Sequence, residues 1–212
     1  MHELQLAANL NGWRIFVRRK EDKAFLPVQK RIFERDNYTC QYCSFQAMEY
    51  QEVVNVDGNY NNNKLSNMIT ACCFCTQGLF LQAVGLDDMG GGQLIYLPEM
   101  SQADLNSFCH VLFCAMENNT GYQDSAQSIY RSFKFRSQIV ENKLGAGASN
   151  PATMGQMIIE YQNREPDTNI DLLQDLRLLP SHAKFRVQLD AWAAAALQEL
   201  KAEAAAAEEE NE

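Results

Sequence analysis

The spacing of apolar and polar residues in the first half of the chain predicts short strands and one early helix. Residues 13–19 alternate apolar with basic side chains, which is typical of a strand with one solvated face. Pro27 suits the first position of a helix that should continue to Arg35. Residues 45–50 and 52–56 are expected to form the two arms of a short hairpin. Two further apolar runs predict a helix and a strand, over residues 78–84 and 93–97.

The second half of the chain predicts helices. Ser101 with Asp104 is an N-terminal helix signal of the capping-box kind, and this helix should run to about Asn118. Asn150 followed by Pro151 combines an N-cap with a proline at the first helical position, so another helix should begin there. The remaining apolar spacings predict helices over residues 124–138, 168–176 and 180–200.

Together these elements predict an α+β fold with an N-terminal strand and a mainly helical C-terminal half. We expect residues 1–100 to hold the strand and a cysteine-bearing module. Residues 101–200 should form a helical region that packs on this module. Residues 201–212 are mostly alanine and glutamate with no apolar face, which is typical of a solvated acidic tail.

Two C-x-x-C pairs give the strongest chemical signal in the chain. Cys40 and Cys43 form the first pair, and Cys72 and Cys75 form the second. Each pair is expected to occupy a tight turn that directs two sulfur atoms at one point, so that two turns complete the tetrahedral coordination of Zn²⁺. The spacing therefore predicts one structural zinc ion bound by these four thiolates. Cys73 should point away from the ion.

Disulfides and redox chemistry are the alternatives for these cysteines. Seven cysteines is an odd number, and the start of the chain lacks the basic and apolar regions of a signal peptide, which disfavours a disulfide framework. A redox C-x-x-C normally occurs singly, beside a βαβ unit. Cys109 and His110, on the helix after Ser101, could form a ligand or nucleophile pair, but they are adjacent in sequence and more typical of core residues.

Composition bears on the cellular location of the protein and on whether it binds nucleic acid. No run approaches the ~18 apolar residues of a membrane span, so we expect a cytoplasmic protein without direct membrane insertion. The formal net charge of −9 opposes nucleic-acid binding by bulk electrostatics, although a local basic patch could still provide it.

The first cysteine pair and its surroundings resemble the HNH, or ββα-metal, family. In that family a short basic helix ends in Arg-Asp before the first zinc knuckle, as Arg35 and Asp36 do here. Residues 67–75 resemble the segment from the central Asn to the second knuckle. The resemblance covers residues 28–80 and implies a ββα zinc module, in which Asn67 supports the hairpin loop.

The chemistry of this family depends on residues that the chain lacks. A histidine of the hairpin acts as the general base, and a His or Asp after the second knuckle helps to hold a catalytic metal. Here Asn55 stands at the first position and Thr76-Gln77 at the second. An amide cannot take up a proton near neutral pH, and Asp57 is the one nearby carboxylate. The resemblance therefore implies a nuclease fold with no catalytic residue.

A broader pattern extends over nearly the whole chain, in residues 13–20, 63–67, 70–75, 94–100, 105–116 and 175–181. These segments resemble the DotN/IcmJ family of the bacterial Dot/Icm type IVB secretion system, which serves protein transport in virulence. The resemblance implies a non-enzymatic, zinc-bearing adaptor of the coupling complex that helps to deliver effector proteins. The implied partners are the C-terminal region of the ATPase DotL, with DotM and the IcmS–IcmW pair. Through this complex the cytoplasmic protein would be recruited to the inner membrane.

Two other functions stay open at this point. One is an active or residual HNH nuclease, and the other is a zinc-dependent nucleic-acid-binding protein without cleavage. The three histidines weigh against the first, because His2, His110 and His182 all lie outside the zinc module. The negative net charge weighs against the second.

Overall fold

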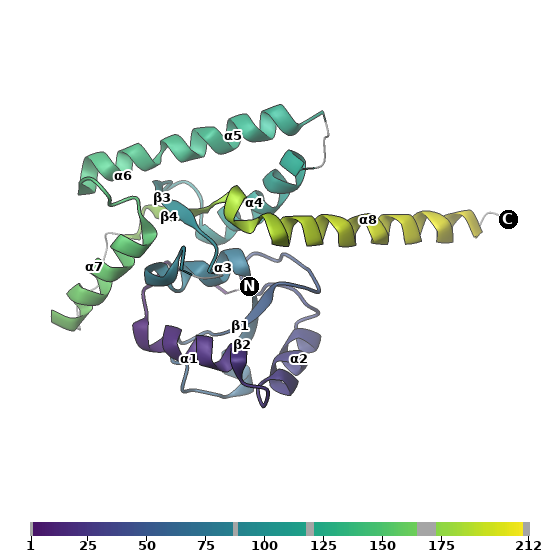
Figure 1. The fold of residues 1–212 in the computed structure, drawn as a ribbon, viewed down its shortest axis with the longest axis horizontal. Coiled ribbons are helices and arrows are strands. Elements are labelled where there is room, and N and C mark those ends of the chain that lie inside the picture. The colour runs from purple at the N-terminus through teal and green to yellow at the C-terminus, as the bar shows by residue number, and fades with distance from the viewer. Residues whose placement is uncertain (1, 87–88, 118–120, 165–172, 210–212) are drawn as a thin grey trace.

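A computed structural model describes residues 2–86, 89–117, 121–164 and 173–209, with side chains described as far as residue 202. Within these ranges, helices alternate with two separate two-stranded antiparallel sheets (Figure 1). The first part of the chain forms α1 (Leu10–Glu21), α2 (Leu26–Arg35), β1 (Gln51–Asn55), β2 (Met68–Cys72) and α3 (Cys73–Gly78). The second part forms β3 (Gly92–Tyr96), α4 (Gln102–Glu117), α5 (Gln123–Phe135), α6 (Ser137–Leu144), α7 (Pro151–Arg164), β4 (Leu176–Pro180) and α8 (Arg186–Glu209).

The predicted N-terminal strand is wrong, because residues 13–19 belong to helix α1. Asn9 caps this helix, with its Oδ1 accepting a hydrogen bond of 2.7 Å from the amide of Gly12. Trp13 and Phe16 lie one turn apart and both pack on Phe80. The apolar spacing thus follows the helical period, and the alternation over seven positions is a coincidence of that period.

Of the hairpin predicted over residues 45–56, one arm is confirmed and the other is wrong. The expected arm at 52–56 matches β1, but its partner is β2, in an antiparallel register that runs from Gln51 opposite Cys72 to Asn55 opposite Met68. Residues 45–50 make no strand; apart from a single bridge between Thr39 and Gln46, this segment is irregular. Positive φ angles at Ser44 and Tyr50 interrupt the extended backbone on both sides of it. Helix α2 was predicted within one residue, and it packs on the β1–β2 sheet through Ile32, Val53 and Met68.

The second sheet pairs β3 with β4, from Gly92 opposite Pro180 to Tyr96 opposite Leu176. The strand expected over 93–97 is confirmed, but β4 was missed, because Leu176 had been placed in a helix and Pro180 at the start of another. In β4 the side chains of Leu178 and Leu179 are both buried, as in a strand covered on its two faces. Residues 168–172 of the expected helix lie outside the described residues.

The helices of the second half mostly begin where their caps predict. The Asp104 amide donates to the Ser101 hydroxyl at the start of α4, and the Thr153 amide donates to Asn150 at the start of α7. The helix expected over 124–138 is divided at Arg136 into α5 and α6. The helix expected over 78–84 is wrong, because α3 ends at Gly78 and a short 3-10 turn follows. Here α7 approaches so closely that a Cβ on its Gly155 would lie 2.2 Å from a backbone nitrogen of that turn.

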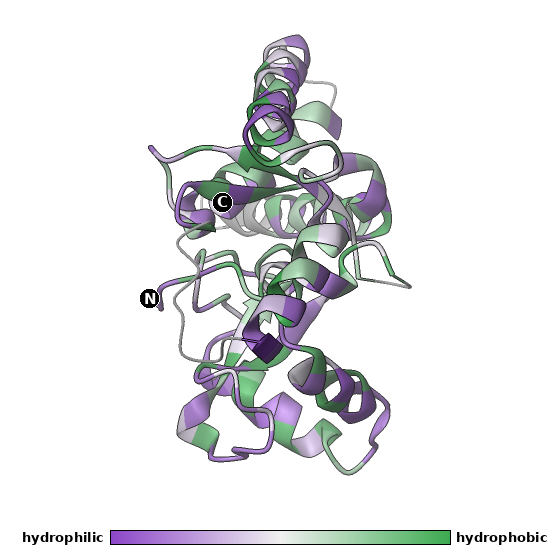
Figure 2. Ribbon diagram, turned by 90° about the vertical axis from the view of Figure 1, so that its left-hand side faces the viewer, coloured by the Kyte–Doolittle hydropathy of each residue, from purple (hydrophilic) through white to green (hydrophobic). Residues whose placement is uncertain are grey.

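The largest core cluster takes residues from both halves of the chain, among them Phe16, Phe74, Leu105, Phe113 and Phe185. The helices at the top and bottom of Figure 2 show hydrophilic and hydrophobic segments in turn, as expected of helices that bury one side. Helix α8 extends away from the other elements toward the C-terminus (Figure 1). No helix among the described residues has the length and hydrophobicity to span a membrane.

Candidate metal centre

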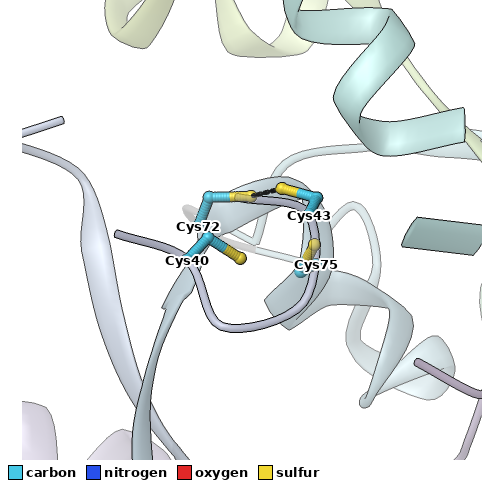
Figure 3. A group of neighbouring side chains, drawn as sticks. All are labelled: Cys40, Cys43, Cys72 and Cys75. Carbon is cyan, nitrogen blue, oxygen red and sulfur yellow. Dashed lines mark hydrogen bonds between the residues drawn. The ribbon is translucent and has the colours of Figure 1, made fainter. Parts of the chain in front are cut away.

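The structure brings the four predicted cysteines together. The sulfur atoms of Cys40, Cys43, Cys72 and Cys75 converge on one point (Figure 3), and all lie within 4.8 Å of one another. The Sγ atoms of Cys43 and Cys72 are 3.6 Å apart. A tetrahedron with Zn–S bonds of ~2.3 Å has edges of ~3.8 Å, so this separation fits a tetrahedral metal site. A disulfide would need an S–S distance of ~2.05 Å, and none of the cysteines forms one.

Each cysteine pair is positioned by local backbone structure. The first pair lies in a turn that the Ser44 amide closes by donating to the Cys40 carbonyl at 3.0 Å, with Ser44 in a left-handed conformation. The second pair lies where β2 passes directly into α3, so that Cys72 ends the strand and Cys75 occupies the first helical turn. The hydroxyl of Thr76 donates to the Cys72 carbonyl at 3.0 Å and fixes this transition.

Cys73 does not join the cluster. It is half-buried and lines a separate cavity of about 330 Å³ between α1 and the start of α3, together with Phe16 and Lys20. Because adjacent residues at the beginning of a helix point in different directions, Cys72 and Cys75 face the cluster while Cys73 faces this cavity.

Electrostatics at the cluster favours a bound cation. All four cysteines are at most 4% exposed. Burial raises the pKa of the Cys72 and Cys75 thiols well above the usual value, because an ionised sulfur loses its hydration. Hydrogen bonds from the other three sulfurs hold the pKa of Cys40 below its usual value. Several thiolates are therefore unfavourable together at this position unless a cation compensates their charge.

Two polar side chains of α4 also contact the cluster. Asn106 Nδ2 donates to Cys75 Sγ at 3.2 Å, and His110 Nε2 lies 3.4 Å from Cys72 Sγ. Sequence reasoning placed His110 in the core, where it lies, but it did not place it beside a cysteine of the cluster. Burial lowers the pKa of His110 to about 3, so its ring is neutral near pH 7.

Asn55, which the resemblance to the HNH family would align with a catalytic base, is held by hydrogen bonds on both ends of its amide. It is 2% exposed, and its Oδ1 accepts a hydrogen bond of 2.8 Å from Arg19 Nη1. Its Nδ2 donates to the carbonyls of Asn59 and Asn62 at 3.1 and 2.9 Å. Arg19 Nη2 also donates to the carbonyl of Val53. Arg19 thus ties helix α1 to strand β1, and the amide of Asn55 connects it to the loop between the two strands.

The loop between β1 and β2 is organised around the carboxylate of Asp57. It accepts hydrogen bonds from Asn62 Nδ2 at 2.7 Å, Asn67 Nδ2 at 2.9 Å and the Asn59 amide at 2.8 Å. The hydrogen bonds from Asn62 and Asn67 hold the pKa of Asp57 below its usual value. Asn67 in turn accepts from the Asp57 amide, so it supports the loop as expected.

Thr76 and Gln77, which the same resemblance would align with a catalytic-metal ligand, are also buried. Thr76 and Gln77 are each 1% exposed. The hydroxyl of Thr76 bonds the Cys72 carbonyl, and Gln77 Oε1 accepts from the amide of Gly91 at 3.3 Å. Neither side chain faces solvent, where a substrate phosphate or a catalytic metal would have to bind.

Comparison with known proteins gives one strong similarity. No protein-family model matches the chain. Over 198 residues it is 56% identical to the type 4 apparatus protein DotN of Legionella pneumophila subsp. pneumophila (strain Philadelphia 1). The aligned segment covers 93% of this chain and 92% of that protein.

Proposed function

The chain belongs to the DotN family of type 4 apparatus proteins, and on this premise we propose that it is a non-enzymatic, zinc-bearing adaptor of the type IVB coupling complex. The observation that carries the proposal is the buried cluster of four cysteine sulfurs within 4.8 Å of one another. An adaptor needs a rigid frame, and a structural metal provides one in a module with only a small core of its own.

Zinc is the ion that best suits the donors. Four thiolates in a closed, buried, tetrahedral arrangement are typical of structural zinc sites, whereas catalytic zinc keeps one position open to water. Cys40, Cys43, Cys72 and Cys75 supply the four ligands of such a closed site. The order β1, β2, α3, with one cysteine pair before β1 and the other at the junction of β2 with α3, supports an HNH-like ββα module.

The absence of catalysis is supported by the bonding of Asn55. Its carbonyl oxygen accepts from Arg19 and its amide donates to two loop carbonyls, which leaves no basic atom at this position. In addition, the side chain is buried, at 2% exposed. We therefore assign no hydrolytic step to the module.

Nucleic-acid binding finds little support in the basic residues of α1. Arg19 is buried against β1, and Lys20 forms an ion pair with Glu52. Of this run, Arg14, Arg18 and Lys20 are exposed, and Lys20 is the one paired with Glu52. Two exposed arginines on a chain of net charge −9 make a weak phosphate-binding surface, and protein partners suit the molecule better.

We propose the C-terminal region of the coupling ATPase DotL as the direct partner, in an assembly with DotM, IcmS and IcmW. In this arrangement the protein stays in the bacterial cytoplasm and reaches the inner membrane through the ATPase. Calorimetry between the zinc-loaded protein and the DotL C-terminal segment should give saturable binding with a negative heat-capacity change, because apolar surface is buried. A segment of the same composition in scrambled order is the control. If the folded, zinc-loaded protein does not bind DotL, the adaptor assignment is wrong.

The metal is tested by a pair of neighbouring substitutions. Elemental analysis should find one zinc per chain in the wild type. The Cys73→Ser variant should also bind one zinc, because Cys73 faces away from the cluster. Cys72→Ser should lose the metal and melt at a lower temperature, because metal binding here contributes to folding free energy. Retention of zinc by Cys72→Ser together with its loss from Cys73→Ser would contradict the assignment. Plasmid nicking with Mg²⁺, Mn²⁺ or Ni²⁺ should be absent.

A further inference from the structure

Helix α4 lies beside the second cysteine pair and directs two polar side chains at it. Asn106 and His110 are one helical turn apart, on the same side of α4, and are 0% and 7% exposed. Asn106 Nδ2 donates to Cys75 Sγ at 3.2 Å, and His110 Nε2 lies 3.4 Å from Cys72 Sγ. Each sulfur of the second pair therefore has its own nitrogen neighbour from one helix.

The amide of Asn106 is held in one orientation by its other hydrogen bond. Gln102 Nε2 donates to Asn106 Oδ1 at 2.9 Å, and a second bond from the same nitrogen reaches the carbonyl of Leu178. Gln102 Oε1 in turn accepts from the Leu178 amide at 2.7 Å. Because the oxygen of Asn106 is occupied by a donor, its NH₂ group must face Cys75.

The ring of His110 is held by stacking. It lies between the rings of Phe45 and Phe74. The ring centroids of His110 and Phe45 are 3.6 Å apart with an interplanar angle of 4°, and those of His110 and Phe74 are 4.2 Å apart with an angle of 11°. Its Nδ1 is buried without a hydrogen-bond partner in the described part of the chain, so its contact with Cys72 is the polar interaction that the ring makes. A neutral imidazole with the proton on Nε2 satisfies this geometry, since it donates toward the sulfur.

The charge of a metal site explains why such donors are needed. Four thiolates with one divalent cation carry a net charge of about −2, and burying charge is costly unless hydrogen bonds compensate it. Within the described residues, no side-chain nitrogen donates to Cys40 or Cys43. The two donors on the second pair thus supply compensation that the first pair does not receive from side chains.

We propose that Asn106 and His110 form an outer coordination layer of the zinc centre, donating N–H···S hydrogen bonds to Cys75 and Cys72. The inference rests on the proposed zinc site and extends it to a helix outside the ββα module. These bonds draw charge from the two thiolates, retain the metal against chelators, and make α4 part of the metal site. Outer-layer partners of this kind typically change metal affinity by about 10–100-fold when they are removed.

The test compares two donor deletions with a control on the same helix. Asn106→Leu removes one donor at similar volume, and His110→Phe keeps an aromatic ring between Phe45 and Phe74 while removing the other. Cys109→Ala perturbs the same buried helix, at a residue that is 0% exposed, without removing a donor. Zinc release to excess chelator should be at least ~10-fold faster in each deletion variant than in Cys109→Ala. The Co²⁺-substituted variants should show shifted sulfur-to-metal charge-transfer bands, which the control should not.

A second measurement needs no substitution. In ¹¹³Cd²⁺-loaded wild-type protein, a scalar coupling between the cadmium and the Nε2 proton of His110 is expected across the N–H···S bond. Equal release rates and unshifted bands in all variants, or no such coupling in the loaded protein, would overturn the outer layer while leaving the metal site intact. If the wild type binds no metal at all, the zinc proposal and this inference both fall.

Discussion

Replacing Asn55 by alanine should destabilise the protein strongly, because its buried side chain makes three hydrogen bonds. The substitution removes the acceptor of Arg19 Nη1 and the donor to the carbonyls of Asn59 and Asn62. Arg19 is itself 9% exposed, so water cannot replace the lost acceptor easily. Burial already lowers the pKa of Arg19, which shows how poorly its charge is solvated there.

The magnitude follows from the three hydrogen bonds. A hydrogen bond to a buried charged group contributes about 1.5–3 kcal/mol, and the two bonds to carbonyls of solvent-accessible loop residues about 0.5–1 kcal/mol each. The expected loss is therefore about 2.5–5 kcal/mol of unfolding free energy for Asn55→Ala. Asn63→Ala, in the same loop but exposed, should stay within about 0.5 kcal/mol of the wild type.

A double-mutant cycle measures the contact itself. Arg19→Met keeps an unbranched apolar stem but removes the charged guanidinium group, so Asn55→Ala in that background leaves no buried cation without its acceptor. The coupling free energy from urea denaturation at pH 7 should be about 1.5–3 kcal/mol. Asn55→His, which restores the nuclease residue type, should be destabilised and should not nick plasmid DNA. A loss below about 1 kcal/mol for Asn55→Ala, or metal-dependent nicking by Asn55→His, would refute a structural role for this residue.

Three further substitutions test contacts that stabilise the fold: a carboxylate, a core side chain and a helix cap. Asp36→Asn should cost about 1–2 kcal/mol at neutral pH, because the carboxylate accepts from Arg35 and from the Thr70 amide. Burial opposes its ionisation, but these hydrogen bonds outweigh burial and lower its pKa, so denaturation curves of variant and wild type should converge as the pH falls below about 4. Phe74→Ala, at a 0% exposed core position, should cost about 3–5 kcal/mol in the same assay. Asn9→Ala should cost about 1–2 kcal/mol through the lost cap of α1, whereas no effect would argue against that cap.

The cysteine pairs could be predicted because each is a local structure. The turn at Cys40 and Cys43 closes within five residues, and the junction of β2 with α3 places Cys72 and Cys75 within one helical turn. Two such turns tend to share one ion, whatever the path of the chain between them. The spacing alone therefore indicated the cluster that the structure contains.

The errors lie where distant contacts decide the structure. Strand β4 pairs with β3, 80 to 88 positions earlier, and its short apolar run fits a helix or a buried strand equally well. The partner of β1 was likewise misplaced, because the nearer segment at 45–50 has its Phe45 ring drawn into the stack on His110. Residues 13–19 of helix α1 were predicted as a strand because seven positions are too few to distinguish the two periods, although Asn9 is a typical N-cap residue.

The sequence also contains a signal for the polar side chains that contact the cysteines. Gln102, Asn106 and His110 recur every fourth residue, on the side of α4 where burial favours apolar side chains. A stripe of three polar residues on a buried helix face indicates partners across the interface, because buried polar groups are hydrogen-bonded. The partners prove to be Leu178 of β4, Cys75 and Cys72. Pattern analysis finds the stripe but cannot name the partners.

Aromatic contacts attach helices α4 and α8 to the second cysteine pair. His110 of α4 and Trp192 of α8 both pack against Phe74, which lies between the two cysteines of the second pair. Trp192 also donates to the carbonyl of Glu49, in the segment between the first pair and β1. Both helices thus contact residues next to the cysteine cluster, and α8 extends away from the other elements toward the C-terminus (Figure 1). A metal at this point would stabilise the surface that the helices present to a partner, so its loss should impair partner binding before it unfolds the elements farthest from the cluster.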